Sequence, residues 1–359
     1  MRVLFAGGGT GGHIFPALAV AREVRDRYPD SEILFIGTKG KIEERVVPAN
    51  GFSFRKIWIS GIQRRFSAAN LFIPVKLVVS MIQSLLICMK FKPQVAVGTG
   101  GYAAWPAISM AKVMGAKIIM IEPNSYPGVT TRLLEKKADD LYLAFENASK
   151  YLRFPAKHRF EGNPIRKEIA LSDKAAAKKE LGFEADKKVV FIVGGSLGAT
   201  RVNRLIAKDI EKFKDAGIQI LWQTGKNEAA EYAALESGSV KVKGFIENMN
   251  VAYSASDLVI SRSGAGAVAE VTALGLPAIF VPSPYVAENH QYHNAKGLAD
   301  LNGCILIEEK NIGEKLTDTI IAAVKNDEQL KSLSENASKF AKKDAAVKIT
   351  DKISEYARK

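Results

Sequence analysis

Short apolar runs alternate with amphipathic stretches along the whole chain. The runs lie at residues 3–6, 33–37, 54–59, 95–98, 117–121, 141–144, 188–193, 219–223, 240–244, 258–261, 278–281 and 304–307. Most stretches between them have apolar residues at helical spacing, as in Ile14, Leu18, Ala21 and Val24. Buried strands that alternate with helices are typical of parallel sheets covered on both faces, so we predict an α/β fold.

The pattern runs twice, and the first strand of each half leads into a glycine loop, GGGTGG at residues 7–12 and GGSLG at 194–198. A chain of 359 residues exceeds the size at which single cores stop growing. We therefore expect two Rossmann-like, doubly wound domains facing a central cleft. The predicted domains are residues 1–161 and 162–343, with a final helix at 344–359 that packs back on the first. The boundary follows from the Asn-Pro pair at 163–164, which disfavours helix.

The first glycine loop lies between a predicted strand and a helix N-terminus, where free backbone N–H groups favour an anion. Its glycines satisfy G-x-G-x-x-G, but the next predicted strand ends without the acidic residue that would hold a ribose. The Lys-Ser/Thr pair of a Walker loop is also missing, since His13 follows the glycines. The loop alone leaves the ligand open.

Other candidate chemistry also follows predicted strands. It consists of GTGGY at 98–102, EPN at 122–124, GGSLG at 194–198, and RSGAG at 262–266 followed by Glu270. GGSLG fits the nucleophile elbow of hydrolases, with Asp257 and His290 or His293 after it, but a phosphate-binding Ser196 ranks higher because the elbow belongs within a single hydrolase sheet. No Asp-x-Asp occurs and the histidines lack ligand spacing, so neither a metal nor a cofactor is expected.

Positive charge is concentrated in the first half. Residues 1–161 hold 23 Lys and Arg against 12 Asp and Glu, whereas residues 162–359 hold 28 against 26. No acidic residue lies between Glu44 and Glu122. Such a region attracts polyanions or anionic lipid, and the lack of aromatic–basic interleaving argues against nucleic acid.

Residues 71–91 are apolar enough to resemble a membrane-spanning helix, but their polar side chains gather on one helical face. We favour an interfacial helix, because a spanning helix would separate the flanking α/β elements; a core helix is nearly as good an alternative. The predicted membrane patch consists of Arg64, Arg65, Phe72, Lys76, Leu85 and Lys90. The two cysteines lie in apolar surroundings and the N-terminus does not read as a signal peptide, which favours the cytoplasm.

Seven ordered motifs together resemble the MurG family: GGTGGHIFP at 8–16, GTGGY, EPN, GNPIR at 162–166, GGSLGA, RSG with Glu270, and NHQ at 289–291. The resemblance covers nearly the whole chain. It implies a metal-independent, inverting GT-B glycosyltransferase that moves N-acetylglucosamine (GlcNAc) from UDP-GlcNAc to the muramyl C4 hydroxyl of lipid I. The product would be lipid II for peptidoglycan synthesis, made by a peripheral protein on the cytoplasmic face of the membrane.

The resemblance also implies roles for individual residues. In the donor site, Arg166 and Ser196 would meet the diphosphate, the backbone of Ile246 the uracil, Glu270 the ribose and Gln291 the sugar.

The implied acceptor site consists of Thr10, Gly11, Gly12, Gly100, Gly101, Tyr102 and Asn124. His13 would be the general base, with Glu122 as the rival base and Asn124 beside it.

The chain departs from the family's usual residues at Leu197, His290 and Trp105. Two alternative functions stay open. One is a UDP-GlcNAc epimerase of the same fold, and the other is a non-catalytic module that binds lipid diphosphates and recruits partners to membranes.

Overall fold

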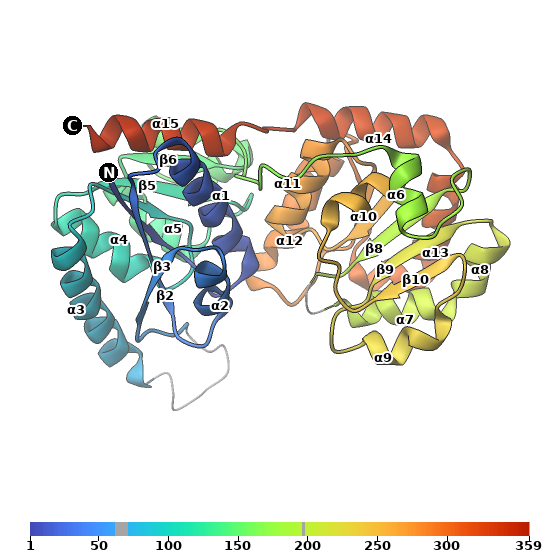
Figure 1. Ribbon diagram of the computed structural model, residues 1–359, viewed down its shortest axis with the longest axis horizontal. Coiled ribbons are helices and arrows are strands. Elements are labelled where there is room, and N and C mark those ends of the chain that lie inside the picture. Colours follow the sequence, from blue (N-terminus) through green and yellow to red (C-terminus); the bar gives the residue numbers. More distant parts are fainter. Residues whose placement is uncertain (62–70, 196–197, 359) are drawn as a thin grey trace. The chain divides into compact units, whose positions relative to one another are not determined.

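The computed structural model describes residues 1–61, 71–195 and 198–358 (Figure 1). The chain divides into two compact units. The first is Met1–Arg166 together with the chain from Lys342 onward, and the second is Lys167–Ala341. The sequence interpretation had put the boundary between residues 161 and 162.

The described part of the first unit contains a seven-stranded, fully parallel sheet in the order β3-β2-β1-β4-β5-β6-β7. Its strands are β1 (Arg2–Ala6), β2 (Glu32–Thr38), β3 (Ser53–Ile57), β4 (Val95–Gly98), β5 (Lys117–Glu122), β6 (Asp140–Leu143) and β7 (His158–Phe160). The strand order reverses direction at β1, which is the doubly wound arrangement predicted from the sequence. The apolar pattern missed β7, because this three-residue edge strand has only one buried residue, His158.

Helices cover both faces of the first sheet. They are α1 (Gly11–Arg27), α2 (Ile42–Ala49), α3 (Ile73–Phe91), α4 (Ala104–Val113), α5 (Val129–Leu134) and α15 (Ala345–Ala357). Side chains of β1 alternate between the two cores: Val3 and Phe5 pack with α1, α2 and α15, whereas Leu4 and Ala6 pack with α3 and α4. This alternation follows from the period of two in a strand.

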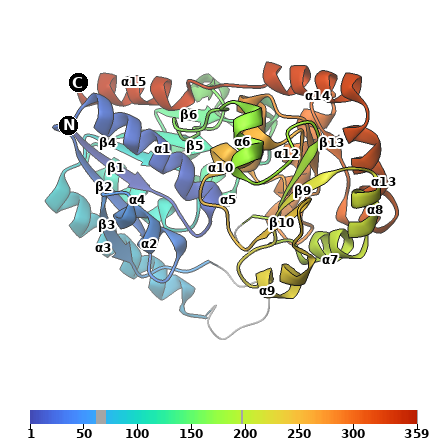
Figure 2. The same cartoon turned by 45° about the vertical axis from the view of Figure 1, so that its right-hand side comes forward.

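The C-terminal helix α15 belongs to the first unit and lies beside α1, from the opposite end of the sequence (Figures 1 and 2). Ile349 and Ile353, one helical turn apart, are fully buried in the core between α15 and the sheet. The Gln94 side chain also donates to the Ala357 carbonyl at 2.8 Å. The apolar face of α15 therefore completes a core that residues 1–166 leave uncovered.

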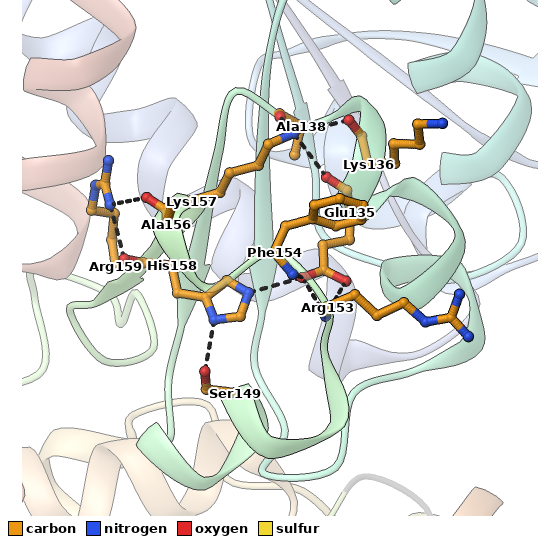
Figure 3. Close-up of polar contacts among 10 residues, drawn as sticks. All are labelled: Glu135, Lys136, Ala138, Ser149, Arg153, Phe154, Ala156, Lys157, His158 and Arg159. Carbon is orange, nitrogen blue, oxygen red and sulfur yellow. Dashed lines mark hydrogen bonds and ion pairs between the residues drawn. The ribbon is translucent and has the colours of Figure 1, made fainter.

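A buried polar cluster holds the edge strand β7 against the turn that precedes β6 (Figure 3). The Glu135 carboxylate accepts the backbone N–H groups of Arg153 and Phe154, at 3.0 and 2.7 Å. It also accepts Nε2–H of His158 at 2.9 Å, and Nδ1 of the same ring accepts the Ser149 hydroxyl at 2.8 Å. These bonds replace the apolar packing that the short strand lacks.

In the second unit the described residues form a six-stranded parallel sheet in the order β10-β9-β8-β11-β12-β13. The strands are β8 (Val189–Val193), β9 (Gln219–Gln223), β10 (Val240–Lys243), β11 (Leu258–Ser261), β12 (Ala278–Phe280) and β13 (Ile305–Leu306). The helices are α6 (Lys174–Glu180), α7 (Thr200–Lys208), α8 (Ile210–Asp215), α9 (Ala229–Tyr232), α10 (Met249–Ala255), α11 (Ala265–Leu274), α12 (His290–Ala299), α13 (Ile312–Val324) and α14 (Asp327–Lys339).

The second sheet is also covered on both faces. Val190 and Ile192 of β8 pack into a core shared with α7, α8 and α13, while Phe191 points the other way, with its ring 5.7 Å from that of Tyr253 on α10. Each unit is thus a Rossmann-like domain with its own core. The sequence interpretation of two doubly wound α/β domains is confirmed.

Candidate functional site

The candidate acceptor site lies at the carboxyl ends of β1, β4 and β5, which are neighbours in the first sheet. The loop at residues 7–10 follows β1, the loop at 99–103 follows β4, and the EPN segment begins at the end of β5. Ligands of doubly wound sheets bind at this edge, because the strand ends and helix N-termini meet there.

The two glycine loops pack directly on each other. A β-carbon at Gly101 would overlap the carbonyl oxygen of Gly8, and one at Gly7 would overlap the Thr99 hydroxyl. A β-carbon at Gly12, by contrast, would meet only the Thr10 hydroxyl, at 3.8 Å. Contact between the loops therefore requires glycine at positions 7 and 101, whereas Gly12 is left as an open position.

His13 is half-buried in the first turn of α1, and its Nδ1 lies 2.8 Å from the Thr99 carbonyl oxygen. A carbonyl only accepts, so Nδ1 carries the hydrogen and Nε2 is the acceptor of the neutral ring. Burial lowers the pKa of His13, and this effect exceeds the opposing effects of the Thr99 bond and the Glu43 charge. The ring is thus neutral at neutral pH, with Nε2 able to accept a proton.

Glu122 is 1% exposed and its carboxylate accepts four hydrogen bonds. Oε1 accepts the backbone and side-chain N–H groups of Asn124 at 3.0 and 3.2 Å, and Oε2 accepts Gly128 N–H at 3.0 Å and the Thr131 hydroxyl at 2.6 Å. Burial raises the pKa of Glu122, although these four bonds oppose the shift. Because both oxygens already have donors, this carboxylate is built to hold Asn124 and the start of α5 in place.

Two further predicted acceptor residues line the same loops. Thr10 is exposed at the N-cap of α1 and its hydroxyl does not cap the helix. The Tyr102 ring is packed close to two glycines: a β-carbon at Gly9 would lie 3.2 Å from its hydroxyl, and one at Gly61 would lie 2.7 Å from Cε1. The structure therefore brings His13, Tyr102 and the loop glycines together at one edge of the sheet.

The candidate donor site lies at the carboxyl ends of the strands of the second sheet. The loop after β8 is folded tightly on itself and against the residue that follows β9, since a β-carbon at Gly194 would lie 2.5 Å from Ala199 N and one at Gly198 would overlap the Thr224 carbonyl oxygen. Gly198 has a φ of +82°, which glycine adopts without strain. Ser196, the predicted diphosphate contact, and Leu197 lie outside the described residues.

Gln223, at the end of β9, ties this loop to the predicted uracil contact. Its buried side chain donates to the Gly195 carbonyl at 3.2 Å and accepts Ile246 N–H at 2.8 Å. The N–H of Ile246 is therefore directed toward Gln223 in this structure.

The remaining donor residues lie around α11 and α12. Glu270, within α11, accepts the Tyr253 hydroxyl at 2.9 Å. Gln291, in the first turn of α12, accepts Ser283 N–H at 2.8 Å with its side-chain oxygen. Gly264 is the N-cap of α11, and a β-carbon at this position would meet no atom within 4 Å. The N-terminus of α11 is therefore open to an anion.

Helix α3 packs against the rest of the first unit with a mixed side, on which Leu77, Ile87 and Phe91 contact the core. Its fully buried residues are Ser80, Ser84 and Cys88. The outward stripe is apolar and consists of Val75, Val78, Ile82, Leu86 and Met89, each more than half exposed, with Leu71 and Phe72 just before the helix. Helix α3 is long and apolar enough to cross a membrane. Only 17% of its most apolar 18-residue segment is buried within the protein.

Members of the predicted membrane patch have different surroundings. Phe72 and Lys90 are exposed, and Leu85 is half-buried. Lys76 is half-buried; its ammonium donates to the Ser60 hydroxyl at 3.0 Å and lies over the Trp58 ring. Arg64 and Arg65 lie outside the described residues.

Comparison with known proteins gives a consistent assignment. The glycosyltransferase family 28 N-terminal domain matches residues 3–143, and the C-terminal domain of the same family matches residues 189–349. A relative from Christiangramia forsetii is 41% identical and covers 98% of this chain and 97% of its own length. One from Cytophaga hutchinsonii is 40% identical, with 99% and 96% covered. Both are named UDP-N-acetylglucosamine–N-acetylmuramyl-(pentapeptide) pyrophosphoryl-undecaprenol N-acetylglucosamine transferase.

Among solved structures, Acinetobacter baumannii MurG matches with a TM-score of 0.79 and 26% identity, covering 99% of each chain. The chain belongs to the MurG family. The resemblance found in the sequence motifs is thereby confirmed. A UDP-N-acetylglucosamine 2-epimerase from Listeria monocytogenes has a TM-score of 0.70 at 14% identity, and this likeness extends to the GT-B fold alone.

Sequence reasoning missed several residues that build these candidate sites. Glu43 and Gln223 are buried polar residues that bind loop backbone, and Thr130 donates to the Gly101 carbonyl at 3.1 Å. Glu43 begins an amphipathic helix and Gln223 ends a predicted strand, positions where polar residues are ordinary. Only their tertiary contacts reveal their roles.

Proposed function

We propose that this chain transfers GlcNAc from UDP-GlcNAc to the C4 hydroxyl of the muramyl sugar in lipid I, with inversion and without a metal. The observation that carries the proposal is His13, held by Thr99 with Nε2 as an acceptor at the edge where two glycine loops meet. The names of relatives 38–41% identical over at least 98% of the chain support the same donor and acceptor.

The proposed reaction is a single displacement. Nε2 of His13 takes the proton of the acceptor hydroxyl, and the hydroxyl oxygen forms a bond to C1 of GlcNAc from the face opposite UDP. The bond from C1 to the β-phosphate oxygen breaks, and its electron pair leaves with UDP. A neutral imidazole is the form that this step requires, in agreement with the lowered pKa of His13.

For the acceptor, we assign Asn124, Thr10 and Tyr102 to the sugar and diphosphate, with the backbone of Gly11, Gly12, Gly100 and Gly101 beside them. The exposed Thr10 hydroxyl and the open position at Gly12 support this assignment. Glu122 then acts on the acceptor through Asn124, since its four donors leave it poorly suited to be the base.

For the donor, we assign Arg166 and the loop containing Ser196 to the diphosphate, Ile246 to the uracil, Glu270 to the ribose hydroxyls and Gln291 to the sugar. A carboxylate that accepts hydrogen bonds suits a ribose diol, and N–H groups at the start of α11 suit a leaving diphosphate. These contacts stabilise the charge that develops on UDP as the bond to C1 breaks.

We also propose that the protein binds the cytoplasmic face of the membrane through α3. The stripe from Val75 to Met89 would lie among the lipid headgroups and upper acyl chains, with Phe72 at its start. Lys90, together with Arg64 and Arg65, would contact anionic lipid. Lys76 supports the fold of this region through Ser60 and Trp58.

The test is transfer of labelled GlcNAc from UDP-GlcNAc to a lipid I analogue in the presence of EDTA, for the wild type and for His13→Ala. We expect wild-type turnover with EDTA and a loss of about 10²-fold or more in the variant, with donor binding retained. A folded wild type that binds UDP-GlcNAc without transfer would instead support the non-catalytic module. Conversion of UDP-GlcNAc to its C2 epimer, in the absence of acceptor, would support the epimerase.

A further inference from the structure

A buried carboxylate lies beneath the first glycine loop. Glu43, in the first turn of α2, has no exposed surface. Its Oε2 accepts Gly9 N–H at 2.9 Å, and its Oε1 accepts Thr38 N–H at 3.0 Å, at the end of β2. One side chain thus joins the ends of two neighbouring strands to the loop that leads into His13.

Two glycines leave room for this carboxylate. A β-carbon at Gly8 would lie 2.7 Å from Oε2 of Glu43, and one at Gly37 would lie 2.6 Å from its Cγ. Any other residue at either position would displace the carboxylate or the backbone. Gly8 and Gly37 are therefore part of the same arrangement as Glu43, and the first glycine loop is shaped around an acid from another element.

Within the described part of the chain, the Glu43 carboxylate forms no ion pair. Among the residues that the structure describes, no Lys, Arg or His nitrogen forms an ion pair with it within 4.0 Å. A carboxylate at this position would stabilise a positive charge that forms nearby, because charges interact more strongly inside a protein than in water.

His13 is where such a charge would form. Burial lowers the pKa of His13, and a negative charge on Glu43, whose carboxylate binds the loop leading into His13, opposes that shift. The ring also lies against uncharged backbone: its Nδ1 is 2.8 Å from the Thr99 carbonyl oxygen, and a β-carbon at Gly100 would lie 2.8 Å from its Cε1.

We propose that Glu43 is a positioning residue of the acceptor site: its carboxylate fixes the glycine loop through Gly9 and stabilises the His13 imidazolium that forms during transfer. The inference rests on the proposed function, in which His13 is the base. The proton moves from the acceptor hydroxyl to Nε2, the ring becomes positive, and Glu43 takes no part in the proton transfer. Glu43 does not touch the substrate.

The test compares Glu43→Gln with the matched control Glu44→Gln. Glu44 is the next residue and is partly exposed, with its carboxylate 3.5 Å from Lys56 Nζ. Histidine-labelled protein contains only four histidines, so His13 can be assigned by its loss in His13→Ala and titrated by NMR without any substrate. Folding of each variant is checked by circular dichroism.

In Glu43→Gln we expect the His13 titration and the acid limb of the kcat profile to move together to lower pH. We expect kcat on the plateau to fall roughly tenfold or more, because a weaker base transfers the proton less well. KM for UDP-GlcNAc should stay unchanged, and Glu44→Gln should match the wild type. A purely structural role would lower kcat at every pH and leave the limb in place.

An unchanged His13 titration in folded Glu43→Gln would overturn the proposal. If Glu43→Gln does not fold, Glu43→Asp provides the test. It keeps the carboxylate but moves it away from the loop by the length of one methylene group. The His13 titration should then move partway to lower pH, and no movement would overturn the inference. Failure of the proposed function can be distinguished from failure of this inference. Full activity of His13→Ala would show that His13 is not the base, while the effect of Glu43→Gln on the His13 titration could still be measured by NMR.

Discussion

The outward face of α3 allows a quantitative prediction about membrane binding. Ile82 and Leu86 lie one turn apart and are 54% and 60% exposed, respectively. Replacing both with glutamine keeps good helix formers on the surface while removing apolar area. The inner residues Ser80, Ser84 and Cys88 are untouched, so the fold of the first unit should be preserved.

The expected loss of vesicle-binding free energy follows from the apolar area that these two side chains expose. Full burial of an Ile or Leu side chain contributes about 1.5–3 kcal/mol, so the exposed half contributes about 1 kcal/mol per residue when it enters lipid. The double variant Ile82→Gln/Leu86→Gln should therefore bind vesicles about 2 kcal/mol more weakly, which corresponds to roughly a 30-fold lower affinity.

The assay is co-sedimentation with vesicles that contain anionic phospholipid, at constant ionic strength. A matched control is Leu301→Gln, which changes an equally exposed apolar residue (54%) on the second unit and should leave vesicle binding unchanged. UDP-GlcNAc affinity should be the same in all three proteins. Wild-type vesicle affinity in the double variant would refute the assignment of α3 as the lipid-binding face.

Three further predictions concern the scaffold of the two sites. Burial raises the pKa of Glu135, but its bonds to Arg153, His158 and Phe154 outweigh this effect and hold the pKa below its ordinary value. Glu135→Gln should thus lower stability to urea by about 1–3 kcal/mol at pH 7, with the difference from wild type shrinking as pH falls below about 4.3. A constant difference across that range would contradict the reasoning. Gln223→Leu leaves Ile246 N–H and the Gly195 carbonyl without this partner, so stability should fall by about 1 kcal/mol and calorimetry should detect roughly tenfold weaker UDP-GlcNAc binding. Gly101→Ala pushes a β-carbon into Gly8, and transfer should fall about 10²-fold while donor affinity stays at the wild-type value.

The sequence predicted the bounds of strands well where a run of apolar residues marked the strand. Strands β4, β9 and β11 have the predicted bounds, because apolar runs identify such elements without tertiary information. Edge strand β7 was missed, since its place depends on the Glu135 and His158 bond between residues 23 apart in the sequence.

By itself, the sequence determined that two doubly wound α/β units are present, which loops follow which strands, and which family the motifs resemble. These properties depend on period, length and spacing, all of which are local. Tertiary structure alone decided which side of α3 is buried: Ser80, Ser84 and Cys88 lie against the rest of the first unit, because the apolar composition of the helix left several sides able to do so. It also decided that the first glycine loop folds around Glu43, a contact between residues 34 apart that no local pattern encodes.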